Sequence, residues 1–205
     1  MLDMIKGNKK IEVIDLFSGV GGLTYGLRES GLSVLAGVDN DNSCAYADEK
    51  NNSAKFISAD ISTFDFEELN KLYSKGSTRV LVGCAPCQPF SSHAFKLRKD
   101  EKDTRWNLLD HFIRGIKVVN PDIVSMENVR GVTKTDVFKN FVRDLKDLGY
   151  KVDWKVVYAP NYGVPQNRSR LILLASKLGE ILIPKETHNK DTYVTVGDVI
   201  RELPK

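Results

Sequence analysis

Short apolar runs alternate with longer stretches of helical periodicity along most of this chain. Runs rich in β-branched residues predict buried strands, and they lie at residues 11–17, 33–38, 55–58, 79–82 and 123–126. Apolar residues at helical spacing predict helices between these strands, at residues 23–29, 42–50, 66–73, 106–119 and 136–148. Two more apolar runs predict a closing pair of strands, at residues 152–158 and 170–176. This order predicts an α/β fold with a doubly wound, mostly parallel sheet and an antiparallel closing strand.

Glycines, and side chains that could take part in binding or catalysis, stand directly after several of the predicted strands. The carboxyl ends of parallel strands meet at one edge of a sheet, and ligands bind there in open α/β folds. The features that this rule brings together are the glycine turn at residues 19–22, Asp39, Asp60, Cys87 and Glu127. The sequence therefore predicts one functional site at this edge.

Cys87 is the strongest candidate because its surroundings are stiff. Pro86 and Pro89 flank it just past the strand at residues 79–82, and proline fixes φ and donates no backbone hydrogen bond. A redox pair or half of a zinc site formed with Cys84 is a lesser alternative. No second cysteine pair completes a zinc set, and a redox pair of the thioredoxin type should open a helix. We therefore expect no metal.

The glycine turn is a weaker signal. Thr24 stands where the dinucleotide-binding fingerprint has its third glycine. Asp39 follows Gly19 by about 20 residues, the spacing of a carboxylate that accepts a ribose hydroxyl. No P-loop lysine follows the glycines, so the turn favours a nucleoside cofactor over a triphosphate. A plain strand-to-helix turn with a solvated aspartate is the alternative.

Five segments in a fixed order make the chain resemble the C5-cytosine-specific DNA methyltransferases, which transfer a methyl group from S-adenosylmethionine to cytosine in DNA. The segments fall within residues 11–176 and lie at 15–22, 86–91, 103–105, 127–129 and 162–170. The chain departs from the family in a more basic loop after Ser91, and in Trp106, where a glycine usually follows the arginine.

The resemblance implies the fold of an S-adenosylmethionine-dependent methyltransferase and a role for each matching residue. Cys87 would add to C6 of cytosine as a nucleophile, and Glu127 would act as the acid at N3. Arg168 and Arg170 would hold the pyrimidine O2. The cytosine would have to flip out of duplex DNA to reach the thiol.

The resemblance also implies which residues bind each ligand. Substrate contacts are implied for Gln88, Ser91 and Asn128. S-adenosylmethionine would be bound by Phe17, Ser18, Gly19, Gly21, Gly22, Leu23, Asp39, Asn40, Asp60, Ile61, Pro86 and Leu108.

Composition and charge change this picture little. A hydrophobic content of 41% and a charged content of 28% are typical of a soluble globular protein, and no apolar run reaches the length of a membrane span. A net charge of +3 permits a double-stranded DNA partner without requiring one. Three cysteines and the lack of a signal-peptide pattern favour a prokaryotic cytoplasmic location.

The resemblance finally predicts the domain organisation. Residues 1–185 are expected to form the catalytic domain, and residues 186–205 to begin a linker toward a target-recognition domain. We expect that domain and the family's closing segments either on a second polypeptide of a split enzyme or beyond a truncation. The leading hypothesis is a DNA (cytosine-5-)-methyltransferase of a restriction-modification system. Alternatives are a non-catalytic or incomplete subunit, a tRNA cytosine-5 methyltransferase and, remotely, a nicotinamide dehydrogenase.

Overall fold

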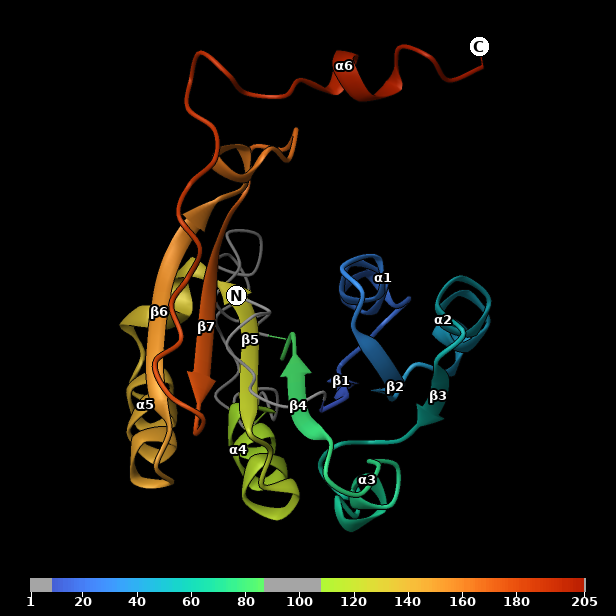
Figure 1. The fold of residues 1–205 in the computed structure, drawn as a ribbon, viewed down its shortest axis with the longest axis vertical. Coiled ribbons are helices and arrows are strands. Elements are labelled where there is room, and N and C mark those ends of the chain that lie inside the picture. The colour runs from blue at the N-terminus through green and yellow to red at the C-terminus, as the bar shows by residue number, and fades with distance from the viewer. Residues whose placement is uncertain (1–8, 87–107, 205) are drawn as a thin grey trace, which may run out of the picture.

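A single seven-stranded sheet organises the molecule in our computed structural model, which describes residues 9–86 and 108–204 (Figure 1). The strand order is β3-β2-β1-β4-β5-β7-β6. The strands are β1 (Ile11–Leu16), β2 (Ser33–Asp39), β3 (Lys55–Ser58), β4 (Thr78–Gly83), β5 (Ile123–Val129), β6 (Lys151–Tyr158) and β7 (Ser169–Ser176). Strands β1 to β5 pair in parallel, whereas β7 runs antiparallel to both β5 and β6. The predicted doubly wound sheet with an antiparallel closing strand is confirmed.

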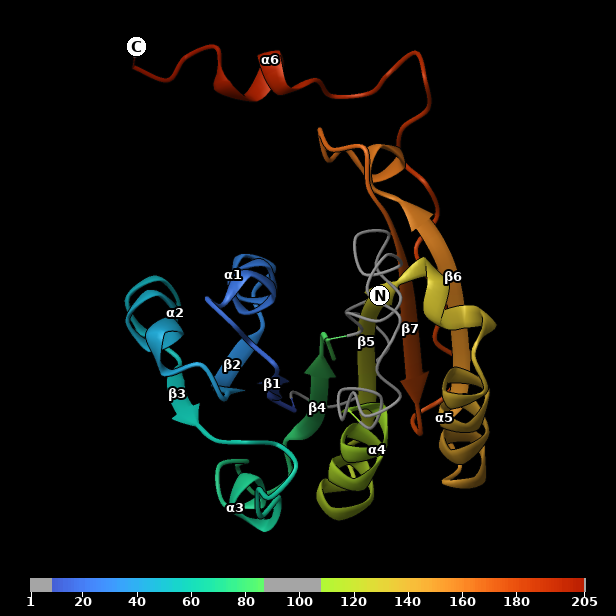
Figure 2. The same ribbon diagram turned by 180° about the vertical axis from the view of Figure 1, so that it is seen from behind.

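Helices cover both faces of this sheet (Figures 1 and 2). One face carries α1 (Gly22–Glu29) and α2 (Ala45–Asn52), and the other carries α3 (Glu67–Asn70), α4 (Leu108–Val119) and α5 (Asp136–Asp147). The short helical turns are η2 (Asn42–Cys44), η6 (Arg130–Lys134), η7 (Ala159–Tyr162) and α6 (Val196–Ile200). The larger apolar core lies under α3, α4 and α5, and a smaller one lies under α1.

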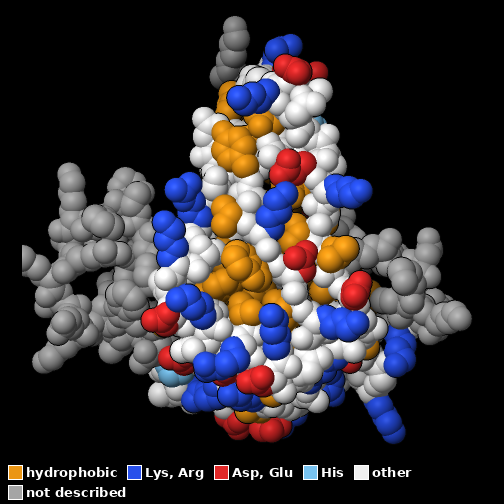
Figure 3. Space-filling view, turned by 90° about the vertical axis from the view of Figure 1, so that its left-hand side faces the viewer, with side chains coloured by type: hydrophobic (Ala, Val, Ile, Leu, Met, Phe, Trp, Pro, Cys, Tyr) orange, Lys and Arg blue, Asp and Glu red, His pale blue; other side chains and the backbone are white. Residues whose placement is uncertain are grey.

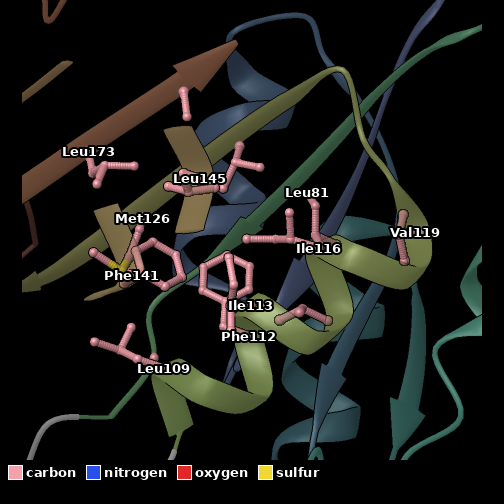
Figure 4. Close-up of a cluster of buried hydrophobic side chains, with 14 of the residues drawn as sticks. Leu81, Leu109, Phe112, Ile113, Ile116, Val119, Met126, Phe141, Leu145 and Leu173 are labelled. Atoms are coloured by element: carbon pink, nitrogen blue, oxygen red, sulfur yellow. The ribbon is translucent and has the colours of Figure 1, made fainter. Parts of the chain in front are cut away.

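Helix α4 illustrates how periodicity becomes packing (Figure 4). Its apolar positions recur at helical spacing, so Leu109, Phe112 and Ile116 face the same way and are buried against β4 and β5. The helix ends where Asn120 takes a left-handed conformation with φ 49° just before Pro121. This packing fixes α4 beside the carboxyl edge of the sheet.

Several element boundaries differ from the sequence prediction; the predicted helix at residues 66–73, for example, shortens to α3. The predicted helix at residues 42–50 is split, because the Asp41 side chain accepts a hydrogen bond from the Ser43 backbone and caps the turn η2 before α2 begins. Strand β5 does not stop before Glu127 but continues to Val129, since pairing with β7 extends it. Glu127 therefore lies within a paired strand, and the prediction that it follows the strand was wrong.

The segment after β7 runs back along the β6–β7 pair and then leads away from the sheet to α6 (Figures 1 and 2). Figure 3 looks onto this side of the molecule and shows hydrophobic side chains gathered among Lys and Arg. Exposed apolar residues of this region include Trp154, Val156 and Leu182. Within the part of the chain that the structure describes, no helix is long and apolar enough to cross a membrane.

Candidate active site

A cavity of about 110 Å³ opens at the carboxyl edge beside β1, β2 and β3. Most of the predicted cofactor residues meet here, since it is lined by Phe17, Val38, Asp39, Asn40, Ala59, Asp60, Ile61, Pro86 and Leu108. The sequence prediction missed Val38 and Ala59. Each directly precedes a predicted acid in the sequence. Their position next to Asp39 and Asp60 could therefore have identified them as lining residues.

The glycine turn is tied to two residues that line this cavity, Val38 and Asp39. Phe17 has φ 61°, and its backbone N–H donates to the Val38 carbonyl at 2.8 Å. Asp39 Oδ2 accepts from the Gly19 backbone at 2.9 Å, and Asp39 Oδ1 accepts from the Asp41 backbone at 2.9 Å. The Asp39 carboxylate thus ties the glycine turn to the end of β2.

Five predicted cofactor residues on the turn and in α1 do not line the cavity themselves: Ser18, Gly19, Gly21, Gly22 and Leu23. Gly21 has φ 81°, and a Cβ built there would lie 2.1 Å from the Asn52 amide nitrogen, so only glycine fits. Ser18 is buried below the turn, where its hydroxyl donates to Asp48 at 3.4 Å. Gly22 and Leu23 form the first turn of α1.

A buried acid lies under this turn. Asp15 is fully buried and accepts one hydrogen bond, from the Thr24 hydroxyl at 2.8 Å. Among residues 9–86 and 108–204, Asp15 Oδ1 has no hydrogen-bond partner. Burial raises the pKa of Asp15 to about 7 against the opposing effect of the Thr24 bond, and the nearby Asp48 carboxylate adds to the rise. The carboxyl edge of β1 therefore holds a poorly satisfied acid.

A second, larger cavity of about 390 Å³ lies on β5, β6 and β7. The predicted catalytic residues Glu127, Arg168 and Arg170 all line it. Arg170 Nε lies 2.8 Å from Glu127 Oε1, and an Arg168 Nη2 atom lies 3.8 Å from the same oxygen. Arg170 is the more buried arginine, with 25% of its side chain exposed against 46% for Arg168. Arg170 can therefore orient the carboxylate, while Arg168 is free to reach a ligand.

The rest of this cavity is largely apolar and was missed by the sequence prediction. Its other lining residues are Val157, Ala159, Tyr162, Val164, Gln166, Ile172, Ile183 and Pro184. The segment after β7 is held there because the Ile183 backbone donates to Asp153 Oδ2 at 2.8 Å and the Tyr162 hydroxyl donates to the Pro184 carbonyl at 3.0 Å. These long-range contacts leave no local pattern in the sequence.

Residues 84–86 connect the walls of the two cavities. Pro86 lines the first cavity. The Asn128 amide donates to the Ala85 carbonyl at 3.1 Å, and Asn128 is only 2% exposed. Its Oδ1 accepts from the Val129 backbone. The amide nitrogen and the oxygen of the Asn128 side chain therefore both bond to the backbone. Asn128, which is predicted to contact the substrate, is thus placed to hold the chain just before Cys87.

Cys84 is half-buried, and its thiol is disfavoured as a nucleophile. Burial raises the pKa of Cys84 to about 12, and the nearby carboxylate of Glu127 adds to the rise. In the described residues, no group of three or more His, Cys, Asp or Glu side chains is placed to hold a metal ion. Cys87, Gln88 and Ser91 lie outside the described residues, so their assignments stay predictions.

Comparisons with known proteins agree with this geometry. A family model described as C-5 cytosine-specific DNA methylase matches residues 11–205. The type II methylase M.HgiDII of Herpetosiphon aurantiacus is 51% identical over 194 residues, which are 93% of this chain and 54% of the relative. The type II methyltransferase M1.HphI of Haemophilus parahaemolyticus is 34% identical over 201 residues, or 94% of this chain and 52% of the relative.

Solved structures share the fold. A chain described as a DNA modification methyltransferase encoded within an Escherichia coli prophage superimposes with a TM-score of 0.75 at 26% identity, covering 96% of this chain and 56% of that one. The S. pombe Dnmt2 methyltransferase gives a TM-score of 0.68 at 22% identity, covering 85% of this chain and 52% of that one. The chain thus spans about half the length of the relatives that it matches.

Proposed function

The chain belongs to the C-5 cytosine-specific DNA methylase family, and from this premise we propose that it is the catalytic part of a type II DNA (cytosine-5-)-methyltransferase of a restriction-modification system. The observation that carries the proposal is the arrangement of two cavities on one sheet edge. One is lined by Asp39 and Asp60, the other by Glu127 with its arginines, and residues 84–86 join them and lead into Cys87.

We propose that the first cavity holds the adenosine part of S-adenosylmethionine, which supplies an electrophilic methyl group when bound. The donor set fits a purine nucleoside, since Phe17, Ile61 and Leu108 offer apolar surface and two acids offer acceptors. Asp39 would accept from the ribose. Asp60 would face the adenine amino group, and hydrogen bonds from Ser62 lower its pKa and keep it an ionised acceptor.

We propose that the second cavity receives a cytosine flipped out of double-stranded DNA. The Cys87 thiolate would add to C6, the ring electrons would move toward N3, and Glu127 would deliver a proton there. C5 would then be nucleophilic enough to take the methyl group, with S-adenosylhomocysteine as the leaving group. Loss of the C5 proton would expel the Cys87 thiolate, and the N3 proton would return to Glu127, which restores the aromatic ring. Arg170 supports Glu127 at 2.8 Å, which leaves Arg168 to hold the pyrimidine O2. Gln88 and Ser91 would contact the substrate.

We further propose that residues 1–185 form the catalytic domain and that residues 186–205 lead toward a target-recognition domain. Four half-exposed apolar residues of this segment recur at the spacing of a helix that docks in an apolar groove: Val196, Val199, Ile200 and Leu203. Their partner would be a target-recognition domain, in a second polypeptide if the enzyme is split. The system would act in the bacterial cytoplasm.

Replacement of Cys87 tests this proposal. DNA containing 5-fluorocytosine should form a covalent adduct with the protein, because the fluorine blocks release of the thiolate after methyl transfer. Cys87→Ser should abolish the adduct and labelled-methyl transfer while leaving cofactor binding nearly intact. Cys84→Ser is the matched control and should keep both adduct formation and methyl transfer, since the pKa of Cys84 is raised to about 12.

The assay should be run with and without a polypeptide carrying a target-recognition domain. Methyl transfer by Cys87→Ser would contradict the proposal.

A further inference from the structure

Arg114 of helix α4 reaches across to the turn that forms one wall of the adenosine cavity. Its Nη2 donates to the Ile61 carbonyl at 2.6 Å and to the Phe64 carbonyl at 3.4 Å. Its guanidinium carbon lies 5.0 Å from the centre of the Phe66 ring. One side chain thus contacts three residues of a distant segment, in which Phe64 lies 50 positions before Arg114 in the sequence.

The close approach of α4 to this segment is built into the helix. Gly115 follows Arg114, and a Cβ built on it would lie 2.7 Å from a Phe66 ring carbon. Phe66 is 2% exposed. A glycine inside a helix lowers its stability, so its presence here fits the need to bring the Arg114 side chain onto the turn.

The turn itself orients an acid toward the cavity. Asp60 Oδ1 accepts from the Ser62 backbone at 2.8 Å, and the Asp60 carbonyl accepts from the Phe64 backbone at 3.0 Å. The Asp60 carboxylate also accepts from the Ser62 side chain. The carbonyl oxygens of Ile61 and Phe64 are the acceptors that Arg114 engages. Arg114 therefore holds from outside a turn whose internal hydrogen bonds end on Asp60.

Helix α4 thus contributes to the cavity twice. Leu108 in its first turn lines the cavity directly, together with Asp60 and Ile61. Arg114 lines no part of the cavity but holds the Ile61 carbonyl. Packing of α4 against the core fixes both contributions relative to β1 and β4.

We infer that Arg114 is a positioning residue for nucleoside recognition, which holds the 60–64 turn so that the Asp60 carboxylate meets the exocyclic amino group of the purine. The inference rests on the proposed function, because it takes the cavity to bind an adenosine-containing cofactor. Its consequence is selectivity: loss of Arg114 weakens the preference for a 6-amino purine over a 6-oxo purine.

Calorimetric titration with S-adenosylhomocysteine and its inosine analogue tests this inference. Arg114→Met should weaken S-adenosylhomocysteine binding about tenfold, with a smaller loss for the inosine analogue, so that the ratio of the two dissociation constants falls. Arg114→Lys keeps the charge but cannot serve two carbonyls and the ring together, and should give an intermediate loss.

Arg79→Met is the matched control. Arg79 also donates to a tertiary partner, Asn70 Oδ1 at 3.1 Å, and its guanidinium carbon lies 5.2 Å from the centre of the Tyr73 ring. It is the second residue of β4 and lies toward the opposite edge of the sheet. Its replacement should lower the melting temperature but leave both dissociation constants within about twofold of wild type.

The outcomes separate the inference from the proposed function. Wild type binding neither ligand would overturn the proposed function and the inference with it. Wild type binding both, with Arg114→Met unchanged in affinity and ratio, would overturn the inference alone, as would an equal loss in Arg79→Met. Should Arg114→Met fail to fold, an unchanged ratio in Arg114→Lys would overturn it, and a lowered ratio would support it.

Discussion

Two carboxylates on strand β1 show how differently the two edges of the sheet are built. Glu12 and Asp15 are both fully buried. Glu12 accepts from the Ser74 backbone at 2.7 Å, from the Ser74 hydroxyl at 2.8 Å and from Lys10 at 2.9 Å. Burial alone would raise the pKa of Glu12, but these partners lower it to about 2. Burial instead raises the pKa of Asp15 to about 7.

The same contrast extends to the neighbouring residues of each edge. At the amino edge, Asp122 accepts from the Arg79 backbone at 2.8 Å, and the buried Tyr73 hydroxyl donates to the Val80 carbonyl at 2.8 Å. At the carboxyl edge, Phe17 has φ 61° and the pKa of Cys84 is raised by burial. Satisfied polar groups stabilise the fold at the amino edge, whereas the poorly satisfied acid Asp15 lies toward the edge where ligands would bind. Function and stability should therefore be separable by mutation.

The largest expected effect is on catalysis at the carboxyl edge. Glu127→Gln should lower the rate of methyl transfer by roughly 10²–10⁴-fold, because it removes the proton donor proposed at cytosine N3. Gln keeps an acceptor for Arg170, so the free energy of unfolding should change by about 1 kcal/mol or less. Single-turnover labelled-methyl transfer and urea unfolding measure the two effects.

The matched control for this prediction is Glu186→Gln. Glu186 is also paired with a cation, Lys155 at 3.0 Å, but lies outside both cavities. It should transfer methyl groups at the wild-type rate. Equal loss of rate in both variants would mean that Glu127 has no specific chemical role.

Asp15→Asn should stabilise the protein at high pH. The folded-state pKa of about 7 lies above the ordinary value of 3.8, so the contribution of Asp15 to stability is fully present below about pH 4 and is lost as the pH rises through 7. Three pKa units correspond to roughly 4 kcal/mol, and Asn, which never ionises, avoids this loss. Urea unfolding at pH 5 and pH 8 should show a steeper fall for wild type. Parallel pH dependences would contradict the assignment.

Glu12→Gln should destabilise the protein, and so change the free energy of unfolding in the opposite direction to Asp15→Asn. The lowered pKa means that the contribution of Glu12 is present above the ordinary value of 4.5 and is lost as the pH falls toward 2. The variant should lose about 3 kcal/mol of unfolding free energy at pH 7, with the gap to wild type closing in acid. Cofactor affinity should stay unchanged, because Glu12 lies at the amino edge. A gap that persists at pH 2 would show that packing, not charge, is lost.

The two cavities differ in how well the sequence predicted their lining residues. The difference depends on whether strand order alone or long-range contacts bring those residues together. The first cavity was largely predictable, since Asp39 ends β2, Asp60 and Pro86 follow β3 and β4, and parallel strands place such residues together. The second was predicted only in its charged residues. Its apolar wall includes Ile183, which reaches the cavity because its backbone bonds to Asp153. No sequence periodicity records such a return of the chain.

Non-local contacts also explain the wrong end of strand β5 and the contacts of Asn128 that the sequence did not predict. Strand β5 continues past the predicted end because Glu127 pairs opposite Ile172 and Val129 opposite Arg170. Asn128 was predicted as a substrate contact, and the Ala85 carbonyl that its amide bonds is 43 positions away. The residues that carry chemistry were visible as residue types. The bonds that orient them were not, because each joins segments that meet only in the folded chain.

The smallest expected effects are those of replacing the partners of Glu12, and they show which partner keeps this carboxylate ionised. Lys10 is 60% exposed and pairs with Glu12 Oε1 at 2.9 Å, so solvent screens its charge, and Lys10→Met should cost less than about 1 kcal/mol. Ser74→Ala removes a part-buried hydroxyl bond to the same oxygen and should cost about 1 kcal/mol. Repeating urea unfolding in 1 M NaCl should erase the Lys10 effect and leave the Ser74 effect in place. The reverse order would mean that surface charge, and not the hydrogen bonds from Ser74, distinguishes Glu12 from Asp15.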